Sequence, residues 1–281
     1  MSDFPRTKIE NLSVSRMIMG SNWFLGFSHT SLAKDRQIVE TMTAKRIADI
    51  VEVFMKAGVD TIMGVRPDAT HLAEAIKDAE DRTSRKCIQI ATPALNIDEG
   101  DAALSDTARI LDANAAIGAA MCMPHQSSTD ALVDRRARKI RDMEKYLAMI
   151  RERGMIPGLS THMPESLIYA DQTGLDVASY IQIYNAAGFL MQIEVDWVQR
   201  LIWQAKKPVI TIKPLAAGRL HPLVGLAFSW ATIRDQDMVA IGTITPDEAR
   251  EVIDISLSLL ERKTIEVRLQ KTRSKKSVET K

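Results

Sequence analysis

The sequence predicts an α/β fold, a single (β/α)8 TIM barrel, and two observations carry that prediction. Short runs of Val, Ile, Met and Ala recur along the whole chain, and each is followed by a longer segment with helical spacing of apolar residues. The length of 281 residues is close to the roughly 250 of a typical eight-unit parallel barrel. The eight predicted strands cover residues 16–20, 60–64, 87–92, 117–123, 156–161, 180–185, 209–214 and 238–243.

Start and stop signals mark the helices between these strands. Thr43 is placed to cap a helix over 44–57, and Gly58 is placed to end it. A long amphipathic helix is predicted over 132–153, with a solvated basic outer face. The last helix begins at Thr245, where Thr-Pro-Asp-Glu forms a capping box with proline at the first helical position.

Composition limits the function classes. The net charge of +1 gives no reason to expect a nucleic-acid or membrane partner, and no apolar run reaches membrane-spanning length. Two cysteines without metal or redox spacing favour a cytoplasmic protein. We expect the barrel to cover residues 1–262 and a basic, solvated tail to cover 263–281. A small-molecule substrate is the expected partner, and self-association stays open.

Strand alternation predicts which side chains face the barrel interior. If the isoleucines of the third, sixth and seventh strands face the helices, the interior becomes unusually polar for a barrel. A lysine in such a place requires a partner or a lowered pKa, so polar residues at the mouth are candidates for function. The side chains predicted to face inward include Gln89, Ser160, His162, Gln182, Tyr184, Thr211 and Lys213.

Two histidines follow adjacent strands and are the main catalytic candidates. His125 and His162 are expected at one mouth, where they could act as acid and base or share a divalent metal with Glu194. Lys213 is the candidate electrophile, base or Schiff-base former, because desolvation activates a lysine amine. The predicted substrate-binding residues are Asn22, His29, Arg66, Ser160, Tyr184 and Asn185.

The loops after the seventh and eighth strands are candidates for phosphate or cofactor binding. Each leads into a helix N-terminus, where backbone amides and the helix dipole favour an anion. Ordinary loop and capping chemistry explains the same residues equally well. The candidate contacts are Gly218, Arg219, Gly242 and Thr243.

Five passages of the chain match the sequence of a known family. They are Ile181-Gln-Ile-Tyr-Asn185, Lys213-Pro-Leu-Ala-Ala-Gly-Arg-Leu220, Val239-Ala-Ile-Gly242 with Thr245-Pro-Asp-Glu-Ala249, Leu12-Ser-Val-Ser-Arg16 with Met19-Gly20, and Gly58-Val-Asp-Thr61. These passages resemble the aldo-keto reductases, in the order that the family has them. The resemblance spans most of the chain diffusely, and it implies a barrel and NADPH-dependent hydride transfer with a tyrosine proton donor helped by Lys, Asp and His. Asp60 matches the aspartate, and His125 lies near the histidine.

The chain lacks several catalytic and cofactor-binding residues that the family has. No tyrosine follows Asp60 within Ile62-Met-Gly-Val-Arg66, and Thr92-Pro93 stands in place of the lysine. The basic residues that hold the 2′-phosphate are missing from Thr243-Ile-Thr245.

We therefore expect acid–base chemistry of the lyase or isomerase class, with or without a metal, on a small polar carbonyl, sugar or phosphorylated compound. An NADPH-dependent reductase with a degenerate set of catalytic residues is the second hypothesis, in which Lys213, Tyr184 or Arg66 would substitute for the missing groups. A non-catalytic binding barrel is the third.

Overall fold

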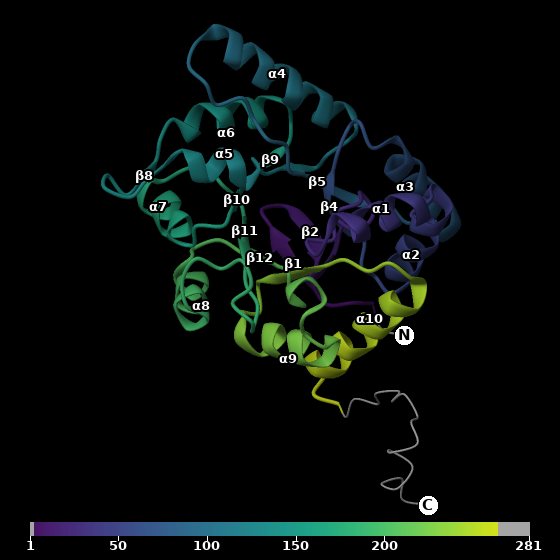
Figure 1. Ribbon diagram of the computed structural model, residues 1–281. Coiled ribbons are helices and arrows are strands. Elements are labelled where there is room, and N and C mark those ends of the chain that lie inside the picture. The colour runs from purple at the N-terminus through teal and green to yellow at the C-terminus, as the bar shows by residue number, and fades with distance from the viewer. Residues whose placement is uncertain (1–2, 264–281) are drawn as a thin grey trace, which may run out of the picture.

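The computed structural model describes residues 3–263 and forms a ring of parallel strands surrounded by helices (Figure 1). Nine strands pair in the order β10-β11-β12-β13-β3-β4-β5-β6-β9. Because β9 and β10 are two pieces of one predicted strand, interrupted at Gly158, the ring has eight units and the predicted barrel is confirmed. The strands are β3 (Met17–Gly20), β4 (Thr61–Val65), β5 (Ile88–Ala91), β6 (Met121–Cys122), β9 (Ile156–Pro157), β10 (Leu159–Thr161), β11 (Tyr180–Ile183), β12 (Val209–Ile212) and β13 (Met238–Ile241).

The helical layer surrounds this ring, and its predicted caps are present. Thr43 Oγ1 accepts the backbone N–H of Arg46 at 3.3 Å, and Thr245 Oγ1 accepts that of Glu248 at 3.0 Å. The helices are α1 (Leu32–Thr41), α2 (Ala44–Lys56), α3 (Thr70–Thr83), α4 (Asp101–Ala116), α5 (Gln126–Ala131), α6 (Met143–Glu152), α7 (Glu165–Thr173), α8 (Val195–Gln204), α9 (Pro222–Thr232) and α10 (Pro246–Leu260), with a 3-10 turn at Ala216–Gly218. No helix within residues 3–263 is long and apolar enough to cross a membrane.

The barrel interior is aliphatic, so the predicted orientation of three strands is wrong. Ile90, Ile181 and Ile210 belong to one buried cluster inside the ring, and Ile88 and Ile212 pack against it. Strands that are buried on both faces are apolar on both faces, so alternation alone does not fix which face is inward.

Two polar side chains of those strands donate hydrogen bonds within the fold, although Gln182 Oε1 has no partner among the described residues. Thr211 Oγ1 donates to the carbonyl oxygen of Met238 at 2.9 Å, and Gln182 Nε2 donates to that of Ile183 at 3.2 Å. The predicted orientation is confirmed on the eighth strand, where Ala240 lies in the interior cluster.

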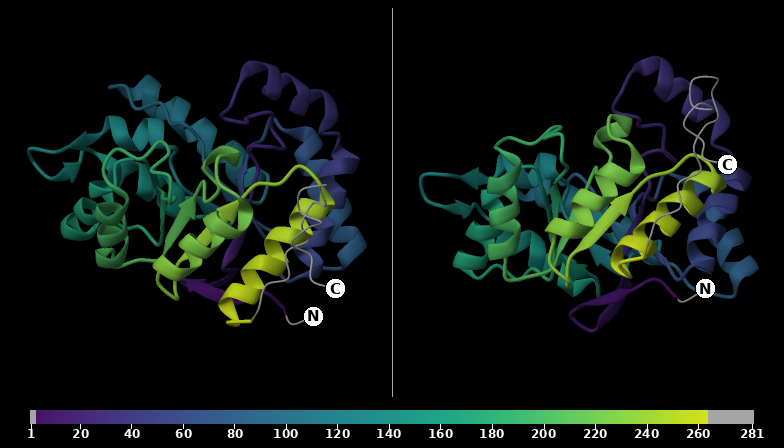
Figure 2. Two further views of the ribbon diagram at one scale, coloured as in Figure 1. Left: turned by 60° about the horizontal axis from the view of Figure 1, so that its bottom comes forward. Right: turned by 90° about the horizontal axis from the view of Figure 1, so that it is seen from below.

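An antiparallel hairpin that the sequence analysis missed closes the N-terminal end of the barrel. Its strands are β1 (Arg6–Ile9) and β2 (Leu12–Ser15), and Ile9 and Val14 are fully buried in the same cluster as the interior isoleucines. Both views of Figure 2 place this hairpin (dark purple) and α1 at opposite ends of the barrel. A ligand therefore enters from the C-terminal end, where α1 lies.

The helix predicted over 132–153 is wrong in its first half. A short hairpin, β7 (Val133–Asp134) with β8 (Lys139–Ile140), precedes α6. Asp134 Oδ1 accepts the backbone N–H of Ala137 at 2.8 Å, which stabilises the turn, and Arg138 has a left-handed φ of 53°. The strand predicted from position 117 begins instead at Met121. The tail from position 264 onward lies outside the described residues.

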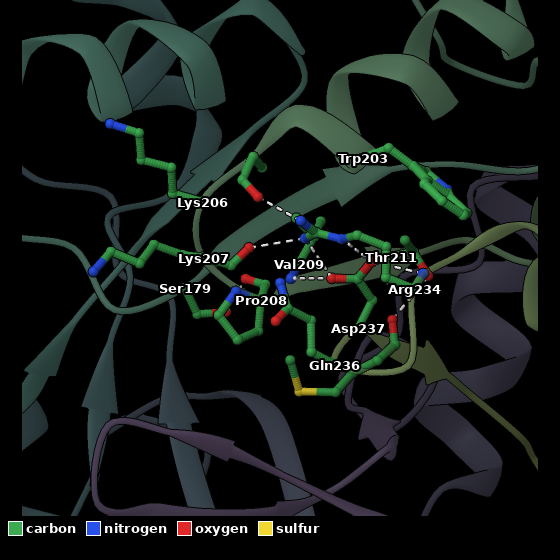
Figure 3. Close-up of polar contacts among 12 residues, drawn as sticks. Ser179, Trp203, Lys206, Lys207, Pro208, Val209, Thr211, Arg234, Gln236 and Asp237 are labelled. Carbon is green, nitrogen blue, oxygen red and sulfur yellow. Dashed lines mark hydrogen bonds and ion pairs between the residues drawn. The ribbon is translucent and has the colours of Figure 1, made fainter.

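A buried ion pair joins β12 to β13 at the N-terminal end of the barrel (Figure 3). Asp237 is fully buried, and its carboxylate accepts the backbone N–H of Val209 at 2.9 Å. The Arg234 guanidinium donates to the same carboxylate at 2.8 Å through Nε and at 2.7 Å through Nη2. Because this network lies at the end opposite the mouth, we assign it to stability.

Candidate functional site

A cavity of about 670 Å³ opens at the C-terminal ends of the strands, where barrel enzymes carry their chemistry. It brings together predicted residues from the loops after β3, β6, β10 and β12. These residues are Asn22, His29, His125, Ser160, His162 and Lys213, and Gly218, Gly242 and Thr243 line its other side.

Lys213 reaches the cavity because the backbone turns where β12 ends. Ile212, the last strand residue, points inward, so simple alternation would send Lys213 outward. Its left-handed φ of 61° redirects the side chain, and Nζ lies 3.0 Å from His29 Nε2. Burial lowers the pKa of Lys213 to about 8, so a substantial share of the amine is neutral near physiological pH.

The three histidines of the cavity are held in the neutral form. Burial, followed by the positive charge of Lys213, lowers the pKa of His29 and of His125. The same causes, with His125 and His29 adding to them, lower the pKa of His162 to about 4. Neutral imidazoles beside a partly neutral amine form a set that exchanges protons at neutral pH.

His125 has a defined tautomer. The backbone N–H of Ser127 donates to its Nδ1 at 3.3 Å, so the ring proton lies on Nε2. The Ser127 hydroxyl is also 2.9 Å from Nδ1. His125 therefore presents an N–H donor to a ligand in the cavity, which it lines.

Asp130, which the sequence analysis missed, holds the loop that carries His162. Its carboxylate accepts the backbone N–H of His162 at 3.1 Å and the hydroxyl of Thr161. Burial raises the pKa of Asp130, and these hydrogen bonds oppose the rise. No local motif points to this residue, because Asp130 on α5 and Thr161 at the end of β10 are 31 positions apart.

Four of the residues predicted to be catalytic or to bind substrate lie outside the cavity. Asp60 precedes β4 at the opposite end of the barrel and pairs with Arg6 Nη1 at 2.8 Å, so it does not share the cavity with His125, His162 and Lys213. Tyr184 faces the helices, where its hydroxyl donates to Thr232 Oγ1 at 3.0 Å. Arg66 forms an exposed ion pair with its neighbour Asp68. Asn185 is fully buried and bonds the backbone of Phe189.

The predicted metal set is not assembled. Glu194 is exposed at the start of α8 and does not line the cavity that holds His125 and His162. Within residues 3–263, no group of three or more His, Cys, Asp or Glu side chains is placed to hold a metal ion.

Arg219, predicted to bind a phosphate or cofactor in the loop after β12, makes other contacts in the structure. Its guanidinium stacks on the ring of Phe189, 4.1 Å from the centroid, and it donates to the carbonyl oxygen of Ala216 at 3.1 Å. It does not line the cavity.

Several lining residues had no signal in the sequence. Trp23 packs against the backbone of Gly242, where an added Cβ would lie 2.5 Å from the indole Cδ1. Glu248 and Glu251 line the cavity from the first turns of α10, although the sequence marked only the capping role of Glu248. Lys34 contributes from α1, a helix inserted between the first strand and α2 that the sequence analysis did not predict.

No family model and no curated protein matches the chain. Among solved structures, a putative aldo-keto reductase from Pseudomonas aeruginosa superposes with a TM-score of 0.63 at 14% identity, covering 92% of this chain and 97% of that one. Glycerol dehydrogenase from Gluconobacter oxydans gives 0.56 at 13% identity, covering 96% and 99%. Thiamine phosphate pyrophosphorylase from Pyrococcus furiosus gives 0.51 at 9% identity, covering 88% and 95%.

These similarities show that the chain has the TIM barrel of the aldo-keto reductases, as the resemblance implied. The family resemblance of the sequence also implied NADP(H), and the cavity does run along the loops after β12 and β13. The lining does not fit the phosphorylated cofactor, however. No tyrosine among the described residues lines it, and its α10 side presents Glu248 and Glu251 instead of basic side chains. A 2′-phosphate placed there would be repelled.

Proposed function

We propose that the protein is a Schiff-base lyase that cleaves a carbon–carbon bond of a small hydroxy-carbonyl compound through Lys213. The observation that carries the proposal is the placement of the Lys213 amine, 3.0 Å from His29 Nε2 in a cavity with two further neutral imidazoles. An amine with a pKa lowered by burial is the nucleophile that such chemistry requires.

The first half of the reaction joins the substrate to the enzyme. The neutral Lys213 amine adds to the carbonyl carbon, while His125 Nε2–H donates a hydrogen bond to the carbonyl oxygen. His29 accepts a proton from the nitrogen and passes it to the oxygen, which gives the neutral carbinolamine. A second proton, taken up from solvent water and released again when the final iminium is hydrolysed, lets the oxygen leave as water, and an iminium ion remains.

The second half breaks the bond. His162 accepts the proton of the hydroxyl group on the carbon β to the iminium, and the bond between the α and β carbons breaks. An aldehyde leaves, and the electron pair forms an enamine. The His162 imidazolium then returns its proton to the enamine carbon. Addition of water to the resulting iminium releases the carbonyl product and restores the amine of Lys213.

Borohydride trapping tests the proposal directly. The protein is incubated with a panel of oxo compounds (pyruvate, hydroxyacetone, dihydroxyacetone and fructose), reduced, and mapped by peptide mass spectrometry. We expect an adduct on Lys213, none in Lys213→Met, and an unchanged adduct in Lys34→Met, which removes the other lysine of the cavity lining. Absence of a Lys213 adduct with every compound would remove the Schiff-base mechanism.

A dinucleotide-dependent reductase is the second candidate, favoured by the course of the cavity along the loops after β12 and β13. Titration with NADH and NADPH, followed by nicotinamide fluorescence, separates the two functions. Cofactor binding without a borohydride adduct would support the reductase. Ligand binding without turnover or adduct, unaltered in the His125→Ala/His162→Ala variant, would support a binding barrel.

A further inference from the structure

The cavity is divided by charge. The amine of Lys213 and the imidazoles come from the strand ends and the loops that follow them, whereas another side of the lining is formed by the first turns of α10. Among the described residues that line the cavity, Glu248 and Glu251 carry the only carboxylates. We call this side, formed by Gly242, Thr243, Ile244, Glu248 and Glu251, the α10 arm.

Two of the backbone amides at the N-terminus of α10 are already bonded within the protein. Glu248 N–H donates to Thr245 Oγ1 at 3.0 Å, and Glu248 Oε2 accepts the N–H of Ile244 at 2.8 Å. Pro246 has no N–H to offer. The capping box therefore fills the site that helix N-termini otherwise provide for an anion.

The basic side chains near the α10 arm do not offset the negative charge of its carboxylates. Arg46 Nε donates to the carbonyl oxygen of Ile244 at 3.2 Å, and its side chain does not line the cavity. Arg250 is paired with the exposed carboxylate of Asp247 at 2.5 Å. Lys34, which does line the cavity, comes from α1 and donates to Gln37 Oε1 at 3.1 Å.

Thr243 gives an independent sign of a ligand. It lines the cavity, it is only 3% exposed, and among the described residues its hydroxyl has no hydrogen-bond partner. Unpartnered buried hydroxyls are rare in folded proteins. A hydroxyl can accept as well as donate, and the carboxylates beside it can only accept when they are ionised.

We infer that the α10 arm binds the vicinal hydroxyl groups of a ligand and excludes a phosphate monoester. Carboxylates accept hydrogen bonds from a diol, and Thr243 Oγ1 completes the polar contacts. Trp23, packed on Gly242, adds an apolar surface beside them. Together with the chemistry of Lys213, which rests on the proposed function, this assigns a polyhydroxylated carbonyl compound without a terminal phosphate as the substrate class.

Two matched ligand pairs test the inference, one for each source of a diol. Sorbitol against sorbitol 6-phosphate represents a free sugar chain, and NAD⁺ against NADP⁺ represents the ribose of a dinucleotide. Isothermal titration calorimetry at millimolar ligand measures binding. Sorbitol has no carbonyl group, so its binding is expected to persist in Lys213→Met even if the Schiff-base mechanism fails.

We expect the unphosphorylated member of at least one pair to bind about tenfold more tightly, because like charges close together oppose binding of the phosphate. Glu251→Lys should shift the ratio of the two affinities toward the phosphorylated member, because it replaces a negative charge by a positive one. Glu251→Gln should weaken binding of the diol. Glu144→Lys makes the same charge change on the exposed surface of α6 and should alter neither. Three results would overturn the inference. They are tighter binding of the phosphorylated member, a ratio of the two affinities that Glu251→Lys leaves unaltered, and no binding of either diol.

Discussion

The pKa of Lys213 is the property on which the proposed chemistry depends, and competitive labelling measures it directly. Trace acetic anhydride acetylates only neutral amines, so the extent of labelling at each lysine follows its own titration between pH 6 and 11. Burial lowers the pKa of Lys213 from 10.5 to about 8. We expect the labelling of Lys213 to reach its midpoint near pH 8, well below the 10.5 of an ordinary lysine side chain.

The size of the effect follows from the shift. Lowering the pKa from 10.5 to about 8 raises the neutral fraction at pH 7 from roughly 0.03% to roughly 10%, about 300-fold. A less basic amine is a weaker nucleophile, and a Brønsted slope of about 0.5, like that of thiols, removes roughly 20-fold of this gain. Lys213 should therefore react roughly 15-fold faster than a fully exposed lysine at pH 7, before any hindrance by the cavity walls.

The midpoint, unlike the rate, does not depend on access to the cavity. Labelling in concentrated urea gives the control, because the midpoint of Lys213 should then move up into the range of the other lysines. A midpoint near the ordinary lysine value of 10.5 in the folded protein would refute the argument that the cavity desolvates Lys213, and the Schiff-base mechanism would lose its nucleophile.

Three further predictions concern stability and the support of the site. Because folding lowers the pKa of Lys213, the unfolded chain binds more protons between about pH 8 and 10.5, so the unfolding free energy should rise with pH across this window, and less in Lys213→Met. Asp237→Ala removes the buried carboxylate that pairs with the Arg234 guanidinium and accepts the backbone N–H of Val209, and it should cost about 3–5 kcal/mol in denaturant unfolding. Asp130→Asn should shift the NMR resonances of the His162 ring but leave the Lys213 borohydride adduct; an adduct lost with unchanged resonances would contradict this assignment.

The sequence predicts the order and number of barrel units well because each strand–helix unit carries its own local pattern. The caps at Thr43 and Thr245 are equally local, and both are present. The helix expected over 132–153 was wrong in its first half because the spacing of apolar residues does not reveal the turn that Asp134 stabilises. The inward and outward faces of β5, β11 and β12 could not be assigned, since both faces of these strands are apolar.

Residues of the site could be predicted where their position relative to the end of a strand determines their location in the fold. His125 and His162 follow strands directly and therefore reach the mouth. Asp60 was misplaced because a short motif match does not show at which end of a strand the residue lies. Glu251 and Trp23 line the cavity through the packing of a helix and a loop, which no local pattern encodes.

The backbone conformation at the mouth of the barrel supports a functional role for the Lys213–His29 pair. Both residues adopt left-handed φ values, 61° and 58°, a conformation that costs a side-chain-bearing residue roughly 1–3 kcal/mol. The same two residues form the 3.0 Å contact between Nζ and Nε2, so the strain falls where the candidate nucleophile meets its proton acceptor. With a relaxed backbone after Ile212, Lys213 would follow the alternation of β12 and point toward the helices. The strained turn thus places in the mouth an amine that the regular strand would have directed away from it.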